Sequence, residues 1–259
     1  MICLISFAGC TDTNVRIGIS IAAFDDMWLT LLREAMEERA NQIDDCSVFI
    51  QDAKEDIAIQ FSHVENFVAQ GYDAIIVNPA DTEATSAITK LCLDAGIPLV
   101  YVNRYPEDSA LPEGVYFVGS DDMVAGRAQA KVLAEKMGGK GNVVIMLGLL
   151  SHAGTRGRTA GAKEVFEKYP DIKIIDEQTA SFQRDKGLDL MSNWLLGGLA
   201  INAVASNNDE MAIGAIMAMK NVNVVPNKDI FVGGVDASPD ALDYMKSGDL
   251  TVTVFQNAK

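Results

Sequence analysis

Polar side chains stand directly after the apolar runs of this sequence, where a chain leaves a buried strand. The run 203–205 is followed by Asn207-Asn208-Asp209 and then by a segment with helical spacing and an acidic first turn. Four other apolar runs lead in the same way to Phe24-Asp25-Asp26-Met27-Trp28, Asn103-Arg104, Asp236 and Gln256-Asn257. In open parallel sheets, ligands bind outside the carboxyl ends of the strands. Amide, carboxylate, guanidinium and aromatic groups gathered there suit a neutral, hydroxyl-rich ligand.

One such corner alone has a simpler explanation. Asn208 or Asp209 can cap the helix by accepting a hydrogen bond from a backbone N–H of its first turn. The recurrence of polar residues after several apolar runs favours a binding site over capping alone.

Apolar runs and helix-like segments alternate along the chain with short connections. The continuous run Ala74-Ile75-Ile76-Val77 is typical of a parallel strand buried on both faces. We expect strands at 15–21, 47–50, 73–77, 97–102, 115–118, 142–147, 172–176, 201–205, 230–235 and 250–255. We expect helices at 27–41, 56–69, 82–95, 121–137, 155–168, 184–196, 209–220 and 239–246. Two such series predict two doubly wound α/β domains, at 15–120 and 121–255, with the first crossing between them near the turn-rich segment 105–114.

Composition narrows the classes of partner. The 259 residues are 49% hydrophobic, which is enough for a sizeable core. A net charge of −15 leaves no basic patch for phosphates, so nucleic acid and anionic membrane surfaces are poor partners. No apolar run reaches the roughly 18 residues of a membrane-spanning helix. Cys46 and Cys92 fit no CxxC or Cys/His spacing, which argues against zinc and redox motifs, and we expect both thiols to be buried and inert.

Residues 1–14 differ in composition from the rest of the chain. An apolar, uncharged stretch ends at Ala8-Gly9-Cys10, and a polar spacer follows. This stretch resembles the end of an export signal with a bacterial lipobox, which would make Cys10 the lipidated N-terminus of a periplasmic or cell-surface protein. The alternative explanation is a gene-start or cloning artefact.

Six short motifs, taken together and in order, resemble one family. They are Arg16-Ile17-Gly18, Phe24-Asp25-Asp26-Met27-Trp28, Ile75-Ile76-Val77-Asn78-Pro79, Asn103-Arg104, Asn207-Asn208-Asp209-Glu210-Met211-Ala212 and Gly234-Val235-Asp236-Ala237-Ser238-Pro239-Asp240. The sequence resembles the periplasmic sugar-binding proteins of ABC importers, in the ribose, galactose and inositol group, from about residue 16 to residue 256. The resemblance implies the type I periplasmic binding protein fold, whose two lobes close around a monosaccharide or cyclitol. Closure would use a hinge near 103–121 and 236–256. A membrane permease is the implied partner, and no cofactor is implied.

The same resemblance assigns roles to individual residues. Trp28 and Phe182 would lie against the two faces of a sugar ring. The positions that would hydrogen-bond the ligand are Asp26, Asn103, Arg104, Arg158, Asn208, Asp236 and Gln256, and His152 matches a histidine of the galactose-binding branch. Without the resemblance, the two aromatic side chains would be interpreted as core residues and Arg158 as part of a surface ion pair.

Some positions differ from the galactose-binding branch. Gly154 stands where that branch has an acidic residue, Ala22 where it has tyrosine, and the segment 138–142 lacks the carboxylates of its calcium loop. We therefore expect no metal, and the pair Asn103-Arg104 favours the ribose and inositol branches. The family continues past residue 256 with a helix that returns to the first lobe and a strand that completes the second. The resemblance thus predicts a C-terminally truncated chain.

Two other function classes fit less well. The sugar-sensing effector domain of a LacI-type transcription regulator shares this architecture, but it needs a DNA-binding helix-turn-helix ahead of Val15. An enzyme is disfavoured because Ser151-His152 lacks an orienting carboxylate and 138–141 lacks the glycine spacing of a phosphate loop. His63 falls in a helix, where we expect it to face solvent or to pack. We expect a monomer, whose closed form can also be delivered to a chemoreceptor.

Overall fold

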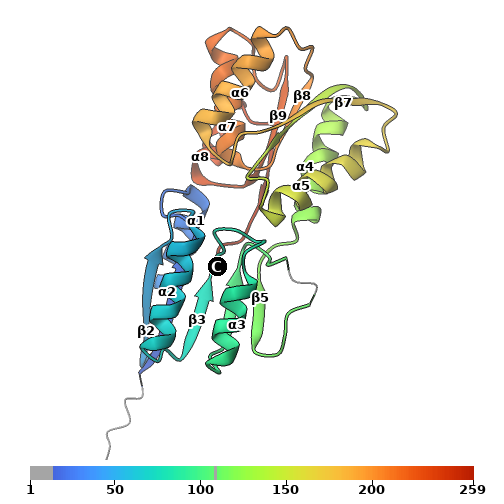
Figure 1. Cartoon of the computed structure of the whole chain (residues 1–259). Helices are drawn as coiled ribbons and strands as arrows, with labels where there is room; N and C mark the ends of the chain where they lie inside the picture. The colour runs from blue at the N-terminus through green and yellow to red at the C-terminus, as the bar shows by residue number, and fades with distance from the viewer. Residues whose placement is uncertain (1–13, 108–109) are drawn as a thin grey trace, which may run out of the picture.

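The computed structural model describes residues 14–107 and 110–259 and has two lobes, each built on a parallel sheet of five strands (Figure 1). The first sheet has the order β2-β1-β3-β4-β5, with β1 (Val15–Ile21), β2 (Cys46–Asp52), β3 (Ala74–Val77), β4 (Leu99–Val102) and β5 (Val115–Val118). The second has the order β10-β9-β8-β6-β7, with β6 (Lys140–Leu147), β7 (Asp171–Thr179), β8 (Ala203–Ser206), β9 (Phe231–Asp236) and β10 (Val252–Phe255). The predicted fold class, two doubly wound parallel-sheet domains, is confirmed.

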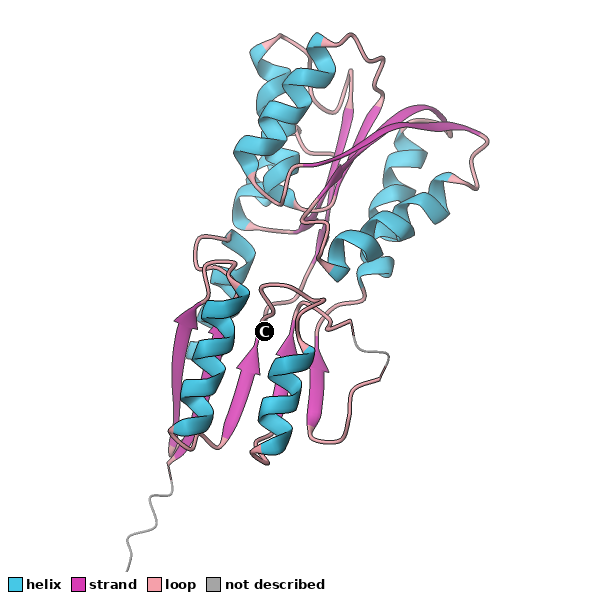
Figure 2. Ribbon diagram, in the orientation of Figure 1, coloured by secondary structure: helices cyan, strands magenta, loops and turns pink. Residues whose placement is uncertain are grey.

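Helices cover both faces of each sheet (Figure 2). In the first lobe, one face packs against α1 (Met27–Ala40), and the other against α2 (Ile57–Ala69) and α3 (Ser86–Asp94). In the second lobe, one face packs against α4 (Asp122–Lys136) and α5 (Ala153–Phe166), and the other against α6 (Arg184–Leu196), α7 (Asp209–Asn221) and α8 (Pro239–Lys246). Four apolar clusters, one on each sheet face, therefore stabilise the lobes by burial.

Local sequence signals place the ends of these helices. The carboxylates of Asp26, Asp56 and Asp121 accept hydrogen bonds from backbone N–H groups in the first turns of α1, α2 and α4. Gly71 and Gly96 follow α2 and α3 with φ of +66° and +67°, a conformation that glycine adopts without steric cost. The carboxyl-terminal ends of α2 and α3 therefore lie at the edge of the sheet opposite to the polar corners.

One predicted helix begins later than its sequence pattern indicates. The expected helix 82–95 starts only at Ser86. The hydroxyl of Thr82 donates instead to the carbonyl of Ser151 in the second lobe, at 2.7 Å. A contact between lobes thus competes with the first turn of the helix. Such a contact between distant segments leaves no periodic signal in the sequence.

The chain crosses between the lobes after β5, at 119–121, and again after β10, where Ala258 packs against the α1 face of the first sheet. The second crossing lies at the very end of the expected hinge 236–256, because β9 and β10 both belong to the second sheet. An apolar groove of about 580 Å³ lies beside α1 on the same face. The helix and strand that the resemblance places beyond these elements stay predictions.

The remaining expectations concern single residues. Cys92 is buried, and burial raises the pKa of its thiol to about 12, whereas Cys46 at the start of β2 is partly exposed, so the expectation of burial is wrong for Cys46. His63 packs with its Nδ1 atom 3.1 Å from the hydroxyl of Ser20. The lipidation predicted at Cys10 lies outside the described residues. Among residues 14–107 and 110–259, no helix has the length and apolarity to cross a membrane, and no cluster of three His, Cys, Asp or Glu side chains is arranged to hold a metal ion.

Candidate functional site

The ten residues that the sequence analysis assigned to a binding site line one cavity between the two lobes. They are Asp26, Trp28, Asn103, Arg104, His152, Arg158, Phe182, Asn208, Asp236 and Gln256, and Leu29 joins them as a residue that the analysis did not single out. The cavity has a volume of about 30 Å³, so in this structure it admits only a small molecule.

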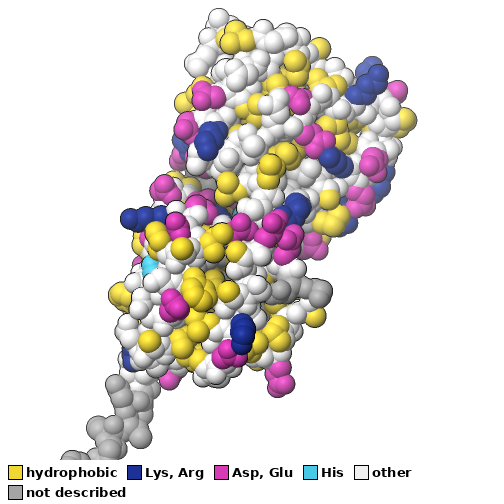
Figure 3. All heavy atoms as spheres, in the orientation of Figure 1, with side chains coloured by type: hydrophobic (Ala, Val, Ile, Leu, Met, Phe, Trp, Pro, Cys, Tyr) yellow, Lys and Arg dark blue, Asp and Glu magenta, His cyan; other side chains and the backbone are white. Residues whose placement is uncertain are grey.

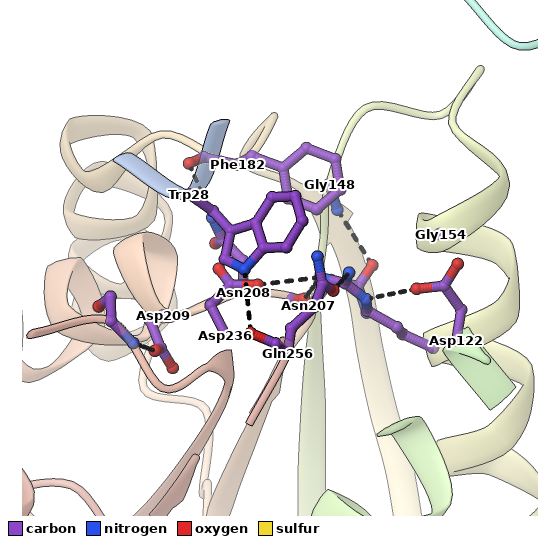
Figure 4. A network of polar contacts seen from close by, with 12 residues as sticks. Trp28, Asp122, Gly148, Gly154, Phe182, Asn207, Asn208, Asp209, Asp236 and Gln256 are labelled. Carbon is purple, nitrogen blue, oxygen red and sulfur yellow. Dashed lines mark hydrogen bonds and ion pairs between the residues drawn. The ribbon is translucent and has the colours of Figure 1, made fainter. Parts of the chain in front are cut away.

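The first lobe contributes residues from the ends of β1 and β4. Asp26 caps α1 by accepting the Leu29 N–H at 2.8 Å, and burial raises the pKa of its carboxyl. Trp28 follows in the first turn, and its indole N–H is directed at the backbone carbonyl of Gln256, 3.5 Å away (Figure 4). Asn103 has a φ of +62°, and this left-handed residue turns the chain away from β4 directly before the next site residue.

Arg104 is almost completely buried, with 3% of its surface exposed. Its two terminal nitrogens bind both carboxylate oxygens of Glu55, at 2.9 and 3.0 Å, and Nη1 also donates to the carbonyl of Pro79 at 2.9 Å. Its Nε atom has no hydrogen-bond partner among the described residues. A buried donor without a partner is rare.

Arg158 ties three segments of the second lobe together. Its Nε donates to Asp122 on α4 at 2.9 Å, its Nη1 to the carbonyl of Asn207 at 2.8 Å and its Nη2 to the side-chain oxygen of Gln256 at 2.5 Å. The carboxylate of Asp236 lies 3.7 Å from Nη1. Because the arginine is 6% exposed, the alternative of a surface ion pair is wrong.

Asp236 ends β9 and is 6% exposed, with a φ of +128°. Burial raises the pKa of its carboxyl well above the usual value. The positive charge of Arg158 lowers this pKa, while the negative charges of Asp209 and Asp26 raise it further. Asp236 lines the cavity, where a ligand hydroxyl that donates a hydrogen bond to its carboxyl group would favour the ionised form.

Asn208 both caps a helix and lines the cavity. Its side-chain oxygen caps α7 by accepting the Met211 N–H at 3.1 Å. Its side-chain nitrogen donates to the carbonyl of Phe182 at 3.1 Å, and the residue also lines the cavity. Capping and site formation are thus not exclusive here.

His152 and Phe182 form the aromatic side of the cavity from the second lobe. The Gly154 N–H donates to Nδ1 of His152 at 2.8 Å, so the proton of the neutral ring is on Nε2. Burial, assisted by three nearby arginines, lowers the pKa of His152 well below 6.5 and keeps the ring neutral. Phe182 packs edge to face on it with ring centres 5.2 Å apart. Gly148 makes room, because a Cβ atom there would lie 2.0 Å from the phenyl ring.

The lobes touch each other beside the cavity. Arg156 on α5 forms ion pairs with Glu83, at 3.5 Å, and with Glu107, both in the first lobe. Figure 3 shows acidic side chains next to basic ones around this junction. Each of these partly exposed ion pairs is weak. Because they join the two lobes, they stabilise only the arrangement in which the lobes are in contact.

The sequence analysis did not single out Asp122 or Glu55, and it named Asn207 only as part of the polar corner after the run 203–205. Asp122, Asn207 and Glu55 hold the two arginines, yet none of them stands out in the sequence as part of a pair. The strand-end position of Asn207 was the available signal, since it follows β8 directly. Glu55 lies in the connection between β2 and α2, where the sequence has no periodicity to interpret.

Two facing α/β lobes with a polar cavity between them are typical of a protein that binds a small solute. Residues 17–259 match the profile of the family described as periplasmic binding protein domain, and the chain belongs to this family. A putative rhizopine-binding protein of Rhizobium meliloti is 46% identical over 258 residues, which cover 98% of this chain and 82% of that protein. A ribose import binding protein of Bacillus subtilis is 33% identical over 240 residues, covering 93% and 75%.

Solved structures agree with this assignment. A solute-binding protein of an ABC transporter from Bacillus halodurans with bound myo-inositol has a TM-score of 0.90 and 40% identity, covering 95% of this chain and 84% of that one. A Caulobacter myo-inositol binding protein with its ligand has a TM-score of 0.88 and 26% identity, covering 94% and 82%. These relatives are solute-binding proteins, which confirms the prediction that the chain is not an enzyme.

Proposed function

We propose that this chain is the substrate-binding component of an ABC importer and closes its lobes around one neutral monosaccharide or cyclitol. The observation that carries the proposal is the composition of the cavity, which combines carboxyl, amide, guanidinium and imidazole groups with the rings of Trp28 and Phe182. A polyol can leave water only if its hydroxyl groups find new partners. The faces of Trp28 and Phe182 suit the C–H faces of its ring.

The balance of charge supports a neutral ligand. Arg104 and Arg158 are already paired with Glu55 and Asp122, so neither guanidinium needs a ligand anion. Burial raises the pKa of the Asp236 carboxyl, and the guanidinium of Arg158, 3.7 Å away, lowers it. Each of these groups can still hydrogen-bond a hydroxyl. An anionic ligand would therefore bring a charge that has no free counter-charge among these arginines.

The relatives support the ribose or inositol type over the galactose type. The putative rhizopine-binding protein and the structure with bound myo-inositol are 46% and 40% identical to this chain. Gly154 and Ala22 also depart from the galactose-binding branch. The same proposal includes export of the chain and delivery of its ligand to a membrane permease. It also includes a lipid anchor on Cys10 and the division into lobes at 15–120 and 121–255.

A thermal-shift panel tests this function. The purified chain is melted with D-ribose, D-galactose, D-glucose, D-xylose, L-arabinose and myo-inositol in turn. A ligand at a hundred times its dissociation constant adds about 2.7 kcal/mol to the free energy of unfolding. We expect one of these polyols to raise the melting temperature of the wild-type chain and not that of the Asp236→Ala variant. If every compound shifts the melting temperature of the two proteins by the same amount, the proposed function is refuted.

A further inference from the structure

Asp209 has a position in the fold that neither helix capping nor ligand contact explains. It opens α7 and is completely buried, yet the cap of this helix is Asn208 and Asp209 is not among the residues lining the cavity. Its Oδ1 accepts a hydrogen bond from the hydroxyl of Thr253 at 2.6 Å, and its Oδ2 accepts the backbone N–H of Ser238 at 2.9 Å. The side chain therefore joins the start of α7 to β10 and to the loop after β9.

The loop held by these bonds is the one that carries Asp236. Both Asp236, with a φ of +128°, and Ala237, with a φ of +52°, adopt backbone conformations that side chains disfavour. The backbone N–H of Ala237 donates to the hydroxyl of Thr253 at 3.0 Å, and the next N–H, that of Ser238, is bound by Asp209. Two consecutive N–H groups directly after Asp236 are thus fixed by one carboxylate–hydroxyl pair. Strained residues persist where the surrounding structure holds them, and this pair supplies the restraint.

Asp209 also acts on Asp236 directly. Burial raises the pKa of the Asp236 carboxyl most, the negative charge of Asp209 raises it further, and the nearby backbone N–H of Asp209 lowers it by a smaller amount. Figure 4 shows the two residues side by side, with Asp209 bound to a backbone N–H. One residue therefore acts on both the side chain of Asp236 and the loop that aims it.

The neighbouring strand leaves space for this carboxylate. Gly234 lies within β9, and a Cβ atom on it would come to 2.1 Å from Oδ1 of Asp209. Gly234 has no positive φ, so its backbone does not require glycine, and the space is what excludes a side chain. A glycine at this point of a buried strand weakens the strand, which is consistent with a role for the carboxylate behind it.

We propose that Asp209 is a positioning residue for ligand binding, which together with Thr253 clamps the strained loop 236–238 so that the carboxyl group of Asp236 points into the cavity. Asp209 does not touch the ligand. The inference rests on the proposed function and deepens it, because it assigns the geometry of one ligand-binding group to a residue outside the site.

The test compares four variants with the wild-type chain. Asp209→Asn keeps the shape of the side chain but removes one acceptor and the charge, and Thr253→Val removes the hydroxyl. Thr253→Ser restores the hydroxyl, and Asp243→Asn removes an equally negative but exposed carboxylate on α8. In calorimetric titrations with myo-inositol, we expect Asp209→Asn and Thr253→Val to weaken binding about tenfold or more, as for a lost charged hydrogen bond. Thr253→Ser and Asp243→Asn should remain within about twofold of wild type, since each keeps the clamp.

A second arm separates positioning from general stabilisation. In the background of Asp236→Asn, which weakens binding by itself, the further change Asp209→Asn should cost little additional affinity, because the positioned carboxylate is already absent. Its effect on the unfolding free energy should persist in both backgrounds. Full additivity of the two losses of affinity would overturn the proposal.

Amide hydrogen exchange of the ligand-free chain decides the question without any ligand. In wild type the N–H groups of Ala237 and Ser238 should be protected, and in Asp209→Asn they should exchange at least about tenfold faster while the amides within β9 are unchanged. Unchanged exchange at both positions would overturn the clamp. If myo-inositol fails to bind even the wild-type chain and the other polyols fail as well, the proposed function is wrong, and the exchange result still decides the role of Asp209 in holding the loop.

Discussion

Replacement of Arg158 by methionine should destabilise the ligand-free chain severely. The side chain is 6% exposed and neutralises Asp122 at 2.9 Å and Asp236 at 3.7 Å. Methionine fills a similar volume but leaves these two carboxylates without a counter-charge, and it leaves the carbonyl of Asn207 and the side chain of Gln256 without a donor. Removal of one partner from a buried ion pair typically costs about 3–5 kcal/mol.

Arg127→Met is the matched control. Arg127 lies on α4 and pairs with Glu164 on α5 at 2.8 Å, but both side chains are about 40% exposed. Exposed ion pairs contribute about 0–1 kcal/mol. The two variants therefore differ in burial and not in the type of residue removed.

The assay is the melting temperature of each variant without ligand. For a chain of this size, 1 kcal/mol shifts the melting temperature by roughly 2 °C, so we expect a decrease of at least about 6 °C for Arg158→Met and of no more than about 2 °C for Arg127→Met. Adding Asp236→Asn to Arg158→Met should recover part of the loss, because it removes one of the unpaired carboxylates. Equal decreases for the two single variants would refute the reasoning from buried charge.

Three further predictions concern other parts of the molecule. Burial raises the pKa of Asp209 to about 6, so the stability that this group contributes is full below its unfolded value near 3.8 and is lost as the pH rises through 6. As the pH rises from 4 to 7, the free energy of unfolding of the ligand-free chain, measured in urea, should therefore fall more for wild type than for Asp209→Asn, by up to about 3 kcal/mol. A difference between the two proteins that does not change with pH would contradict this. Phe182→Ala should weaken polyol binding about three- to tenfold in calorimetry, whereas Phe255→Ala, a residue 71% exposed, should leave it unchanged. Arg156→Met breaks the ion pairs between lobes and should weaken binding by up to about fivefold at low salt and negligibly at high salt; an effect independent of salt would contradict the electrostatic origin.

One physical rule predicts part of the cavity lining from the sequence, whereas Trp28, His152, Arg158 and Phe182 were assigned from the family resemblance. The carboxyl ends of parallel strands meet at one edge, so polar residues that follow β1, β4, β8 and β9 must come together even though they are far apart in the chain. The alternation of apolar runs and helical segments likewise predicted each strand and helix in its order. The predicted start of a helix was wrong where a tertiary contact determines it. Thr82 binds the second lobe, and α3 begins only at Ser86.

What the sequence could not show is how the site residues are held. The bond from Arg158 to Gln256 joins residues 98 positions apart, and the partner of Arg104 is a glutamate in a connection without any pattern. The positive φ of Phe182 is also unexpected, since the residues that adopt such a conformation are mainly glycine, asparagine and aspartate. These features depend on packing between elements, which local propensity and periodicity do not encode.

The central claim is that one small polyol binds between the lobes through the cavity around Asp236. Calorimetric titration of myo-inositol and D-ribose into the wild-type chain and into Asp236→Ala tests this claim most directly. We predict saturable binding of one of the two polyols to wild type with a stoichiometry of one, and no measurable binding to the variant at the same concentrations. Binding of equal strength to both proteins, or no heat from either polyol with wild type, would contradict the account.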